Sequence, residues 1–282
     1  MDSRFNHNQT NFIGISEGGI RTSVAVEKYR ILFDVGYLPY YYSQMDNLFL
    51  THGHLDHSAG VPYYISQRSL KKMKGPNIYV PEEMKDDLEQ ILQLYQKIEN
   101  FKYSYNLFGL KAGDTVHLSS HAACRAFPTL HRIPSLGYTV YDKSLKLKDE
   151  LKVLTGDEIR NLRKKGLEIH DHKLTPVISF SGDTQIDPIL TNQDVLNSKV
   201  LFLECTYLCE ERPKEKAREW GHLHLDEIAE HAELFQNEKL VLMHFSKRYS
   251  YSEIRNYIRK KLPEDLCKRT VPLIPEKNIH VY

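Results

Sequence analysis

Four side chains that can bind metal ions occur within six residues, at His52, His54, Asp56 and His57. The apolar run at residues 48–51 precedes them and predicts a strand. In an extended chain alternate side chains share one side, so His52 and His54 can face one ion. The two later ligands emerge after a turn, in a new direction. Imidazole and carboxylate are ligands that zinc and its first-row neighbours accept, and clustered imidazoles would repel one another if protonated. The segment therefore predicts parts of two adjacent metal shells.

The elements that must position such a site can be outlined from hydrophobic periodicity. Short apolar runs separated by turns predict strands at residues 12–16, 22–27, 30–34 and 48–51. Apolar residues at helical spacing predict a helix at residues 81–100. Further strands are predicted at 115–118, 123–130, 137–141, 177–181, 200–204 and 240–244, and further helices at 225–235 and 252–261. No Pro- or Ser-rich linker divides the chain, so we expect one layered α/β domain with sheets inside and helices outside.

Composition limits the classes of protein to which the chain can belong. Its 282 residues carry 38 Lys and Arg against 37 Asp and Glu, and the formal net charge of +1 excludes a strongly basic protein that binds nucleic acid indiscriminately. The 14 histidines agree with a metal or acid–base site. We expect no secretory signal and no membrane span, because neither pattern of apolar residues occurs. No two cysteines have the spacing of a redox motif, which predicts reduced thiols in a cytoplasmic protein; they are Cys124, Cys205, Cys209 and Cys267.

The His-x-His-x-Asp-His pattern of residues 52–57 resembles that of the metallo-β-lactamase superfamily. Three further segments resemble motifs of tRNase Z, the nuclease that trims the 3′ trailer from precursor tRNA. They are a His followed by Gly-Tyr at residues 128–138, Ser-Gly-Asp-Thr within residues 180–184, and His-x-Ser-x-Arg-Tyr at residues 244–249. The resemblance covers nearly the whole chain and is strongest to the short, plant-type form. It implies an αββα four-layer sandwich of the metallo-β-lactamase fold, as a single domain over residues 1–282 with a compact inserted arm at about residues 142–175.

The resemblance also implies a division of the metal ligands. It assigns His52, His54 and His131 to one metal and Asp56, His57 and His244 to the other, with Asp183 bridging the two. The implied cofactor is two Zn²⁺ ions in each subunit, with Mn²⁺ or Fe²⁺ as alternatives. Two such metals, about 3.5–4 Å apart, hold a shared water as hydroxide and bind the oxygens of a phosphodiester, so the nucleophile is expected to be water.

The departing oxygen of the reaction needs a proton. By resemblance His222 is the general acid and Glu204 orients it, and these two with Asp56 are the expected catalytic residues. Residues 222–224 read His-Leu-His where the family commonly reads His-Ser-Thr, so His224 is a second candidate. Gly221 stands before His222 as the family pattern requires, which favours His222. The alternative is that one of the two histidines caps or packs against the helix predicted from residue 225.

RNA binding by a nearly neutral chain requires a local basic surface. Residues 143–165 contain eight basic and four acidic residues, a local net charge of +4 that can bind phosphates without reading sequence. By resemblance this segment lies in the arm that grips the tRNA body, with Arg163, Lys164 and Lys165 as candidate contacts. Arg248 belongs to a binding motif of the family. The alternative for the arm is a solvated helix of mixed charge.

A group of tyrosines offers a second surface for RNA. Tyr37, Tyr40, Tyr41 and Tyr42 could stack on unpaired bases at a tRNA 3′ end. They could equally pack in the core or in an interface, which is the commoner role of tyrosine. We therefore leave them outside the candidate site.

The resemblance implies a zinc-dependent endoribonuclease that removes the 3′ trailer from precursor tRNA, as a homodimer. We expect this enzyme in the cytoplasm. The alternative is a related binuclear hydrolase acting on small phosphodiesters or other esters without tRNA specificity. A diiron protein that handles oxygen or nitric oxide is disfavoured, because such proteins more often carry Glu where His54 stands. A metal-free RNA-binding protein conflicts with the seven candidate ligands.

Overall fold

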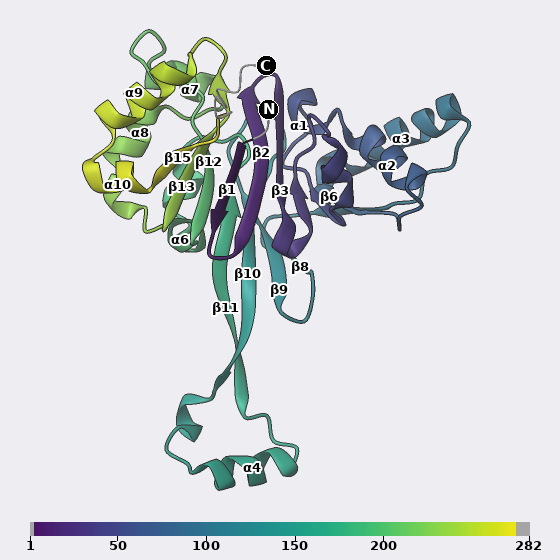
Figure 1. Ribbon diagram of the computed structural model, residues 1–282, viewed down its shortest axis with the longest axis vertical. Coiled ribbons are helices and arrows are strands. Elements are labelled where there is room, and N and C mark those ends of the chain that lie inside the picture. Colours follow the sequence, from purple (N-terminus) through teal and green to yellow (C-terminus); the bar gives the residue numbers. More distant parts are fainter. Residues whose placement is uncertain (1–2, 275–282) are drawn as a thin grey trace, which may run out of the picture.

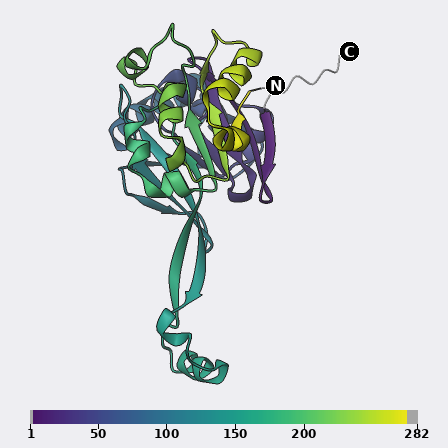
Figure 2. The same cartoon turned by 90° about the vertical axis from the view of Figure 1, so that its left-hand side faces the viewer.

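Two β-sheets pack face to face, and helices cover their outer faces (Figures 1 and 2). The computed structural model describes residues 3–274 of the chain. The first sheet runs in the order β1(Ser3–His7), β2(Thr10–Gly18), β3(Arg21–Val26), β4(Ile31–Phe33), β5(Asn47–Phe49), β6(Asn77–Pro81), β7(Asn106–Leu110), and β14(Phe245–Ser246) also pairs with β2. The second runs β15(Thr270–Pro272), β13(Lys239–Met243), β12(Val200–Glu204), β11(His170–Phe180), β10(Leu136–Leu147), β9(Ala122–Pro128), β8(Thr115–His117).

Alternation along the strands sorts apolar side chains into three layers of core. In β12, Val200 and Phe202 face the first sheet, where they pack with Phe12 and Phe33. The intervening residues of the same strand, such as Leu201, face the outer helices instead. Because successive side chains of a strand point to opposite faces, a strand buried on both faces must be apolar throughout. This pattern builds the αββα sandwich that the sequence predicts.

Helices pack on the outer face of each sheet. The first sheet is covered by α2(Val61–Leu70) and α3(Lys85–Glu99), and α1(Leu55–Ser58) precedes them. The second is covered mainly by α8(Leu225–Glu230) and α9(Tyr251–Lys261), with α5(Asp187–Leu190), α6(Gln193–Asn197), α7(Lys214–Glu219) and α10(Glu264–Arg269) around them. The helix predicted at residues 81–100 is confirmed as a short 3₁₀ turn (Glu82–Met84) followed by α3. The helix predicted at residues 225–235 is shorter, because α8 ends at Glu230 and a 3₁₀ turn (Ala232–Leu234) follows.

Strands β10 and β11 extend far beyond the sheet as an antiparallel pair and carry α4(Gly156–Lys164) at their far end (Figures 1 and 2). Their register runs from Tyr138 opposite Phe180 to Leu147 opposite His170. The sequence predicts only residues 137–141 and 177–181 of these strands, because the side chains described in the outer halves are exposed or partly exposed and mostly polar. A capping box between Thr155 and Glu158 begins α4, and none of its side chains is buried.

The ends of the central strands converge on one edge of the sandwich. Strands β4, β5, β6 and β7 are parallel to one another, as are β11, β12, β13 and β15. Parallel strands deliver the residues that follow them to a common edge, which is where α/β folds usually bind ligands. No helix of the described residues is long and apolar enough to cross a membrane.

Candidate metal centre

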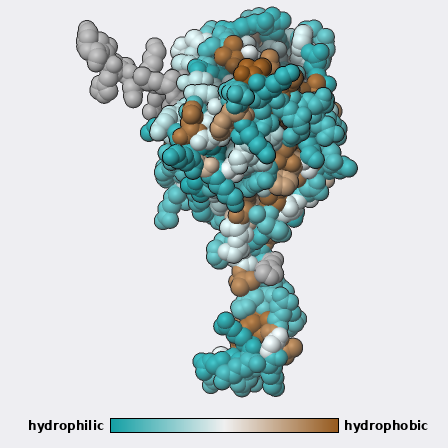
Figure 3. Space-filling model, turned by 90° about the vertical axis from the view of Figure 1, so that its right-hand side faces the viewer, coloured by the Kyte–Doolittle hydropathy of each residue, from teal (hydrophilic) through white to brown (hydrophobic). Residues whose placement is uncertain are grey.

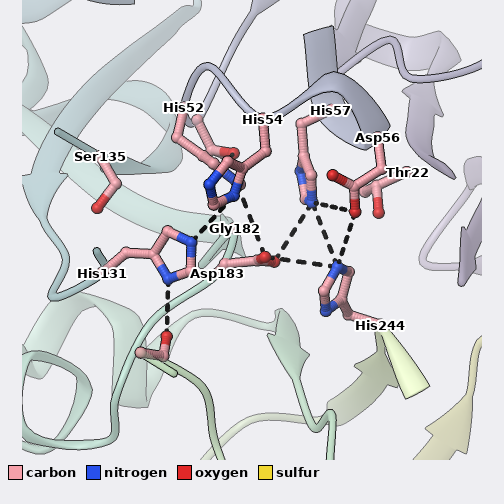
Figure 4. Close-up of polar contacts among 12 residues, drawn as sticks. Thr22, His52, His54, Asp56, His57, His131, Ser135, Gly182, Asp183 and His244 are labelled. Atoms are coloured by element: carbon pink, nitrogen blue, oxygen red, sulfur yellow. Dashed lines mark hydrogen bonds and ion pairs between the residues drawn. The ribbon is translucent and has the colours of Figure 1, made fainter. Parts of the chain in front are cut away.

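The seven candidate ligands come together at this edge, although four separate segments of the chain contribute them (Figure 4). His52 and His54 follow β5, and Asp56 and His57 lie in α1. His131 lies between β9 and β10, Asp183 follows β11, and His244 joins β13 to β14. The structure thus gathers all the ligands that the sequence analysis names.

One half of the cluster consists of three imidazoles and a carboxylate. The Nδ1 atom of His54 lies 3.1 Å from Nε2 of His52 and 3.2 Å from Nε2 of His131. Nε2 of His52 lies 3.8 Å from Oδ2 of Asp183. The four ligand atoms all lie within 4.8 Å of one another, a spacing that fits one metal ion.

The other half joins Asp56, His57 and His244. Nε2 of His244 lies 3.3 Å from Nε2 of His57 and 3.4 Å from Oδ2 of Asp56. Asp183 lies between the halves, with Oδ1 at 3.4 Å from Nε2 of His57 and Oδ2 at 3.4 Å from Nε2 of His244. Oδ1 of Asp183 is buried and has no hydrogen-bond partner in the described part of the chain. A buried carboxylate oxygen without a donor calls for a cation, so the residues fit a pair of metal ions.

Asp34 orients two ligand rings, His57 by a direct hydrogen bond and His52 through the Thr51 hydroxyl. Its buried carboxylate accepts a hydrogen bond from Nδ1 of His57 (2.8 Å) and others from the backbone N–H (2.7 Å) and hydroxyl of Thr51. Because the Thr51 hydroxyl donates to Asp34, its oxygen accepts from Nδ1 of His52, 2.9 Å away. Both hydrogen bonds place a proton on Nδ1 and direct Nε2 of the ring to the centre, as metal-binding histidines require. Burial alone would lower the pKa of His57, but the Asp183 and Asp34 carboxylates raise it to about 9, so a bound metal must displace the proton on its Nε2.

Glu204 plays the same part on the other side. Its buried carboxylate accepts from Nδ1 of His222 (3.0 Å) and from the hydroxyl of Thr206 (2.7 Å). The Thr206 oxygen then accepts from Nδ1 of His244 at 3.0 Å, so His244 also presents a bare Nε2. Nδ1 of His131 donates to the carbonyl oxygen of Gly221 at 2.8 Å, with the same result.

Asp34, Thr51 and Thr206 were not predicted as site residues from the sequence. Asp34 directly follows the apolar run of β4, so a polar residue at a strand end was an available signal for it. Each of the two threonines lies close in sequence to a candidate site residue, but this position alone does not distinguish them from other buried threonines.

Burial and neighbouring charges shift the pKa values of the site in two directions. Burial lowers the pKa of His52, His54 and His131, which keeps these rings in the neutral form that binds metals. Burial alone would also lower the pKa of His222, but the Glu204 carboxylate raises it to about 9. In the absence of a metal, His222 is therefore a cation near neutral pH and can give up a proton.

The two candidate acids have different surroundings. His222 remains partly exposed at the mouth of the site, and its Nδ1 lies 3.8 Å from Oδ2 of Asp183. His224 is buried: its Nδ1 accepts from the backbone N–H of Asp226 at the start of α8, and its Nε2 lies 3.2 Å from the carbonyl oxygen of Cys209. His224 thus caps a helix, which is the alternative that the sequence analysis leaves open for one of the pair.

The structure places the basic residues of the arm far from the metal centre, whereas Arg248 is four residues from the ligand candidate His244. Arg163, Lys164 and Lys165 are exposed at the end of α4, at the far end of the β10–β11 extension. Arg248 is exposed just beyond β14. Within the tyrosine group, Tyr42 is buried with its hydroxyl donating to the carbonyl of Ile13, whereas Tyr40 is exposed.

Comparison with known proteins decides the family. A model described as a beta-lactamase superfamily domain matches residues 36–245. The chain is 40% identical over 262 residues to tRNase Z TRZ1 of Arabidopsis thaliana, and the match covers 92% of this chain and 93% of that protein. The chain belongs to the tRNase Z family.

Other members of the tRNase Z family and of its fold agree. The chloroplastic tRNase Z TRZ2 of Arabidopsis thaliana is 37% identical, with 92% of this chain and 74% of that protein covered. The crystal structure of the short form of human tRNase Z superposes with a TM-score of 0.58 at 20% identity, over 84% of this chain and 93% of that one. The metallo-β-lactamase fold protein YhfI of Bacillus subtilis gives 0.59 at 14% identity, over 92% and 93%. The metallo-β-lactamase fold predicted from the sequence is confirmed.

Proposed function

We propose that this member of the tRNase Z family is a zinc-dependent endoribonuclease that removes the 3′ trailer from precursor tRNA. The observation that carries the proposal is the likeness to Arabidopsis tRNase Z over 92% of the chain, which spans the whole constellation of ligands. This likeness does not favour the alternative of a hydrolase without tRNA specificity.

The proposed ligand sets are those of the two halves of the cluster, with Asp183 shared. When bound, two zinc ions would supply an activated water and positive charge for the phosphodiester oxygens. His222 donates the proton that the leaving oxygen requires, and Glu204 holds its ring for this purpose. Asp56, whose carboxylate accepts from the backbone N–H of Gly19 at 3.0 Å, is placed at the mouth to accept a proton from water.

Zinc is proposed as the metal because five imidazoles and two carboxylates form the cluster. This donor set suits zinc, and it also accepts Mn²⁺ and Fe²⁺. Metal analysis of protein purified without added metal tests the choice. Two zinc ions per chain support it, and visible absorbance from stoichiometric iron contradicts it.

The arm is the proposed contact to the tRNA body, and Arg248 is a separate proposed contact to the substrate. We interpret residues 142–175 as an arm inserted in a single domain, since β10 and β11 hold α4 away from the sandwich (Figure 1). The three basic residues that end the arm helix, Arg163, Lys164 and Lys165, are exposed there. Phosphate contacts at that distance position the RNA without reading its sequence.

A homodimer is proposed from an exposed apolar face on α2 and α3. Ile91, Leu94, Tyr95 and Ile98 follow one stripe of α3, and Leu94 and Ile98 are 60% and 75% exposed. Leu70 at the end of α2 extends the face, and Figure 3 shows apolar patches on this side of the molecule. A contiguous apolar surface of this kind is typical of a protein interface. Sedimentation of the protein and of a Leu94→Glu variant tests it: a dimer that becomes a monomer supports the proposal, and a monomer in both contradicts it.

A cytoplasmic location is proposed on the chemistry of the four cysteines, which form no disulfide.

The function is tested by incubating the protein with zinc and a trailer-bearing precursor tRNA, alongside a small phosphodiester. His54→Ala and Asp183→Ala are expected to lose metal and all hydrolysis, whereas His222→Ala is expected to keep metal and lose turnover. Hydrolysis of the small ester without cleavage of the precursor would contradict the proposal.

A further inference from the structure

An aromatic–cationic pair stands on the rim of the metal centre. The indole ring of Trp220 is 44% exposed, and Cζ of Arg132 lies 4.9 Å from the centre of the ring. Arg132 directly follows the metal-ligand candidate His131, and Trp220 directly precedes Gly221. Arg132 is exposed, and none of the ion pairs among the described residues 3–274 involves it, so its charge is available to a ligand.

The backbone fixes this pair relative to the centre. The carbonyl oxygen of Gly221 accepts the Nδ1 proton of His131, and a Cβ added at Gly221 would lie 2.8 Å from that nitrogen and 3.2 Å from the backbone nitrogen of Arg132. Gly221 also has φ +74°, a conformation that other residues rarely adopt. The segments 131–132 and 220–221 are therefore pressed together, and Trp220 cannot move far without moving a ligand ring.

A groove leads away from the same rim. It has a volume of about 510 Å³ and is lined by His131, Arg132, Ile133, Lys111 and Ser135 among others. This volume lies in the range of sites for small ligands, about 300–1,000 Å³. One acidic residue, Glu83, also lines it, and the Lys216 ammonium lies 5.9 Å from the Trp220 ring while paired with Glu219. The rim thus offers an exposed aromatic face with cations beside it, the combination that binds unpaired nucleotides.

We propose that Trp220 and Arg132 bind an unpaired nucleotide of the substrate RNA, namely the one that carries the leaving oxygen. This inference rests on the proposed function. Trp220 is two residues from His222, and the ring centres of His131 and His222 are 5.2 Å apart. Because His222 protonates the leaving oxygen, the nucleotide that bears this oxygen lies on the His222 side of the centre. Its base stacks on the indole, and a neighbouring phosphate pairs with the Arg132 guanidinium.

The chain allows a direct test, because Trp220 is its only tryptophan and intrinsic tryptophan fluorescence reports on this residue alone. The inactive His222→Ala variant is titrated with end-labelled precursor tRNA, and binding is followed independently by the anisotropy of the label. Three RNAs are compared: the intact precursor, one abasic at the nucleotide that carries the leaving oxygen, and one abasic on the other side of the bond. The end groups of the wild-type products identify which nucleotide carries that oxygen.

We expect the intact RNA and the RNA abasic on the other side of the bond to quench the tryptophan fluorescence. The RNA abasic at the leaving-oxygen nucleotide is expected not to quench it. Binding without quenching overturns the inference and leaves the proposed function standing. Quenching that depends on the other nucleotide overturns the assignment. The absence of any RNA binding refutes both the inference and the proposed function.

Cleavage rates provide the matched variants. Trp220→Leu is expected to lower kcat/KM on the intact precursor by about 5- to 150-fold, the range for loss of one base stack, whereas Trp220→Phe keeps most of it. With the RNA abasic at the leaving-oxygen nucleotide, Trp220→Leu is expected to have little effect. Tyr40→Leu is the control, since Tyr40 is an exposed ring with the Lys71 ammonium 3.4 Å from its centre. The inference would be overturned if Trp220→Leu lowered kcat/KM equally on the intact and the abasic RNA. It would also be overturned if Tyr40→Leu lowered kcat/KM on the intact RNA but not on the abasic RNA.

Discussion

Replacing Glu204 by Gln removes one acceptor from a carboxylate that has no acceptor to spare. Oε1 of Glu204 accepts from the backbone N–H of Thr184 at 2.8 Å and from Nδ1 of His222 at 3.0 Å. Oε2 accepts from the hydroxyl of Thr206 at 2.7 Å and from the backbone N–H of Leu223 at 3.2 Å. The side chain is fully buried, so water cannot replace a lost partner.

Either orientation of the new amide in the Glu204→Gln variant disturbs a histidine. With the NH₂ group at the first position, Nδ1 of His222 must lose its proton, and the raised pKa that the carboxylate supports is lost. With the NH₂ group at the second position, the Thr206 hydroxyl must accept from it and donate to His244, which moves the proton of that ring to Nε2 and blocks a metal ligand. In both cases one backbone N–H is left facing a donor.

The magnitude follows from these contacts. A buried donor left without an acceptor costs about 1–3 kcal/mol, so two such donors are expected to lower the free energy of unfolding by about 2–6 kcal/mol. Loss of the proposed general acid is expected to lower kcat on precursor tRNA by about 100-fold or more. Urea unfolding measures the first quantity, and single-turnover cleavage at saturating enzyme measures the second.

Glu227→Gln is the matched control for this substitution. Glu227 is also buried and accepts two hydrogen bonds, from the backbone N–H of His224 at 3.0 Å and from Nε of Arg218 at 2.7 Å. It touches no proposed ligand or acid, so its variant is expected to lose about 1–2 kcal/mol of stability and to keep its rate of cleavage. A Glu204→Gln variant whose kcat stays within about threefold of that of the wild type would refute the role assigned to Glu204.

Three further predictions concern the metal centre and the arm. Thr206→Val should lower zinc affinity by about 10- to 100-fold, measured by competition with a chromophoric chelator, because His244 loses the acceptor that fixes its proton, while Thr206→Ser should retain affinity. The control is Thr139→Val, because Thr139 is buried and its hydroxyl hydrogen-bonds to Ser179, away from the ligands. Equal affinities in all three variants would contradict this prediction. Removing metal with a strong chelator should abolish cleavage and lower the unfolding temperature, because the imidazole ligands and the unpartnered Asp183 oxygen lose their cation. Adding zinc should restore the cleavage and the unfolding temperature. An unchanged unfolding temperature without metal would argue against a bound pair of metal ions. Changing Arg163, Lys164 and Lys165 together to Ala should weaken binding of precursor tRNA and reduce the slope of log affinity against log salt concentration by about 2–3. Hydrolysis of a small phosphodiester should be unchanged. An unchanged slope would show that the arm helix does not contact phosphate.

Much of the fold could be predicted from apolar periodicity, because the central strands are buried on both faces. Residues 200–204 and 240–244 illustrate this: their continuous apolar runs match β12 and β13 almost residue for residue. The outer halves of β10 and β11 could not be found in this way, because none of the side chains whose burial the structure describes there is buried, so no apolar pattern is set. Charged residues there read equally well as a loop or helix.

The candidate ligands could be identified because metal chemistry restricts residue type and because a strand end precedes several of them. Their outer partners could not be identified in the same way. Thr51 and Thr206 act through single hydroxyl bonds to Asp34 and Glu204, and such contacts depend on how two sheets pack rather than on local sequence. The choice between His222 and His224 shows the same limit, since only the packing of α8 shows which ring is buried as a cap.

The central claim is tested most directly by mapping the cut in a precursor tRNA. The protein with zinc is incubated with a precursor that carries a 3′ trailer and a label at its 5′ end, and the 3′ end of the labelled product is determined at nucleotide resolution. We predict one cut, at the junction of the tRNA body and the trailer, that is absent in the Asp183→Ala variant. Cleavage at scattered positions, or no cleavage by a protein shown to contain two metal ions, would contradict the proposed function.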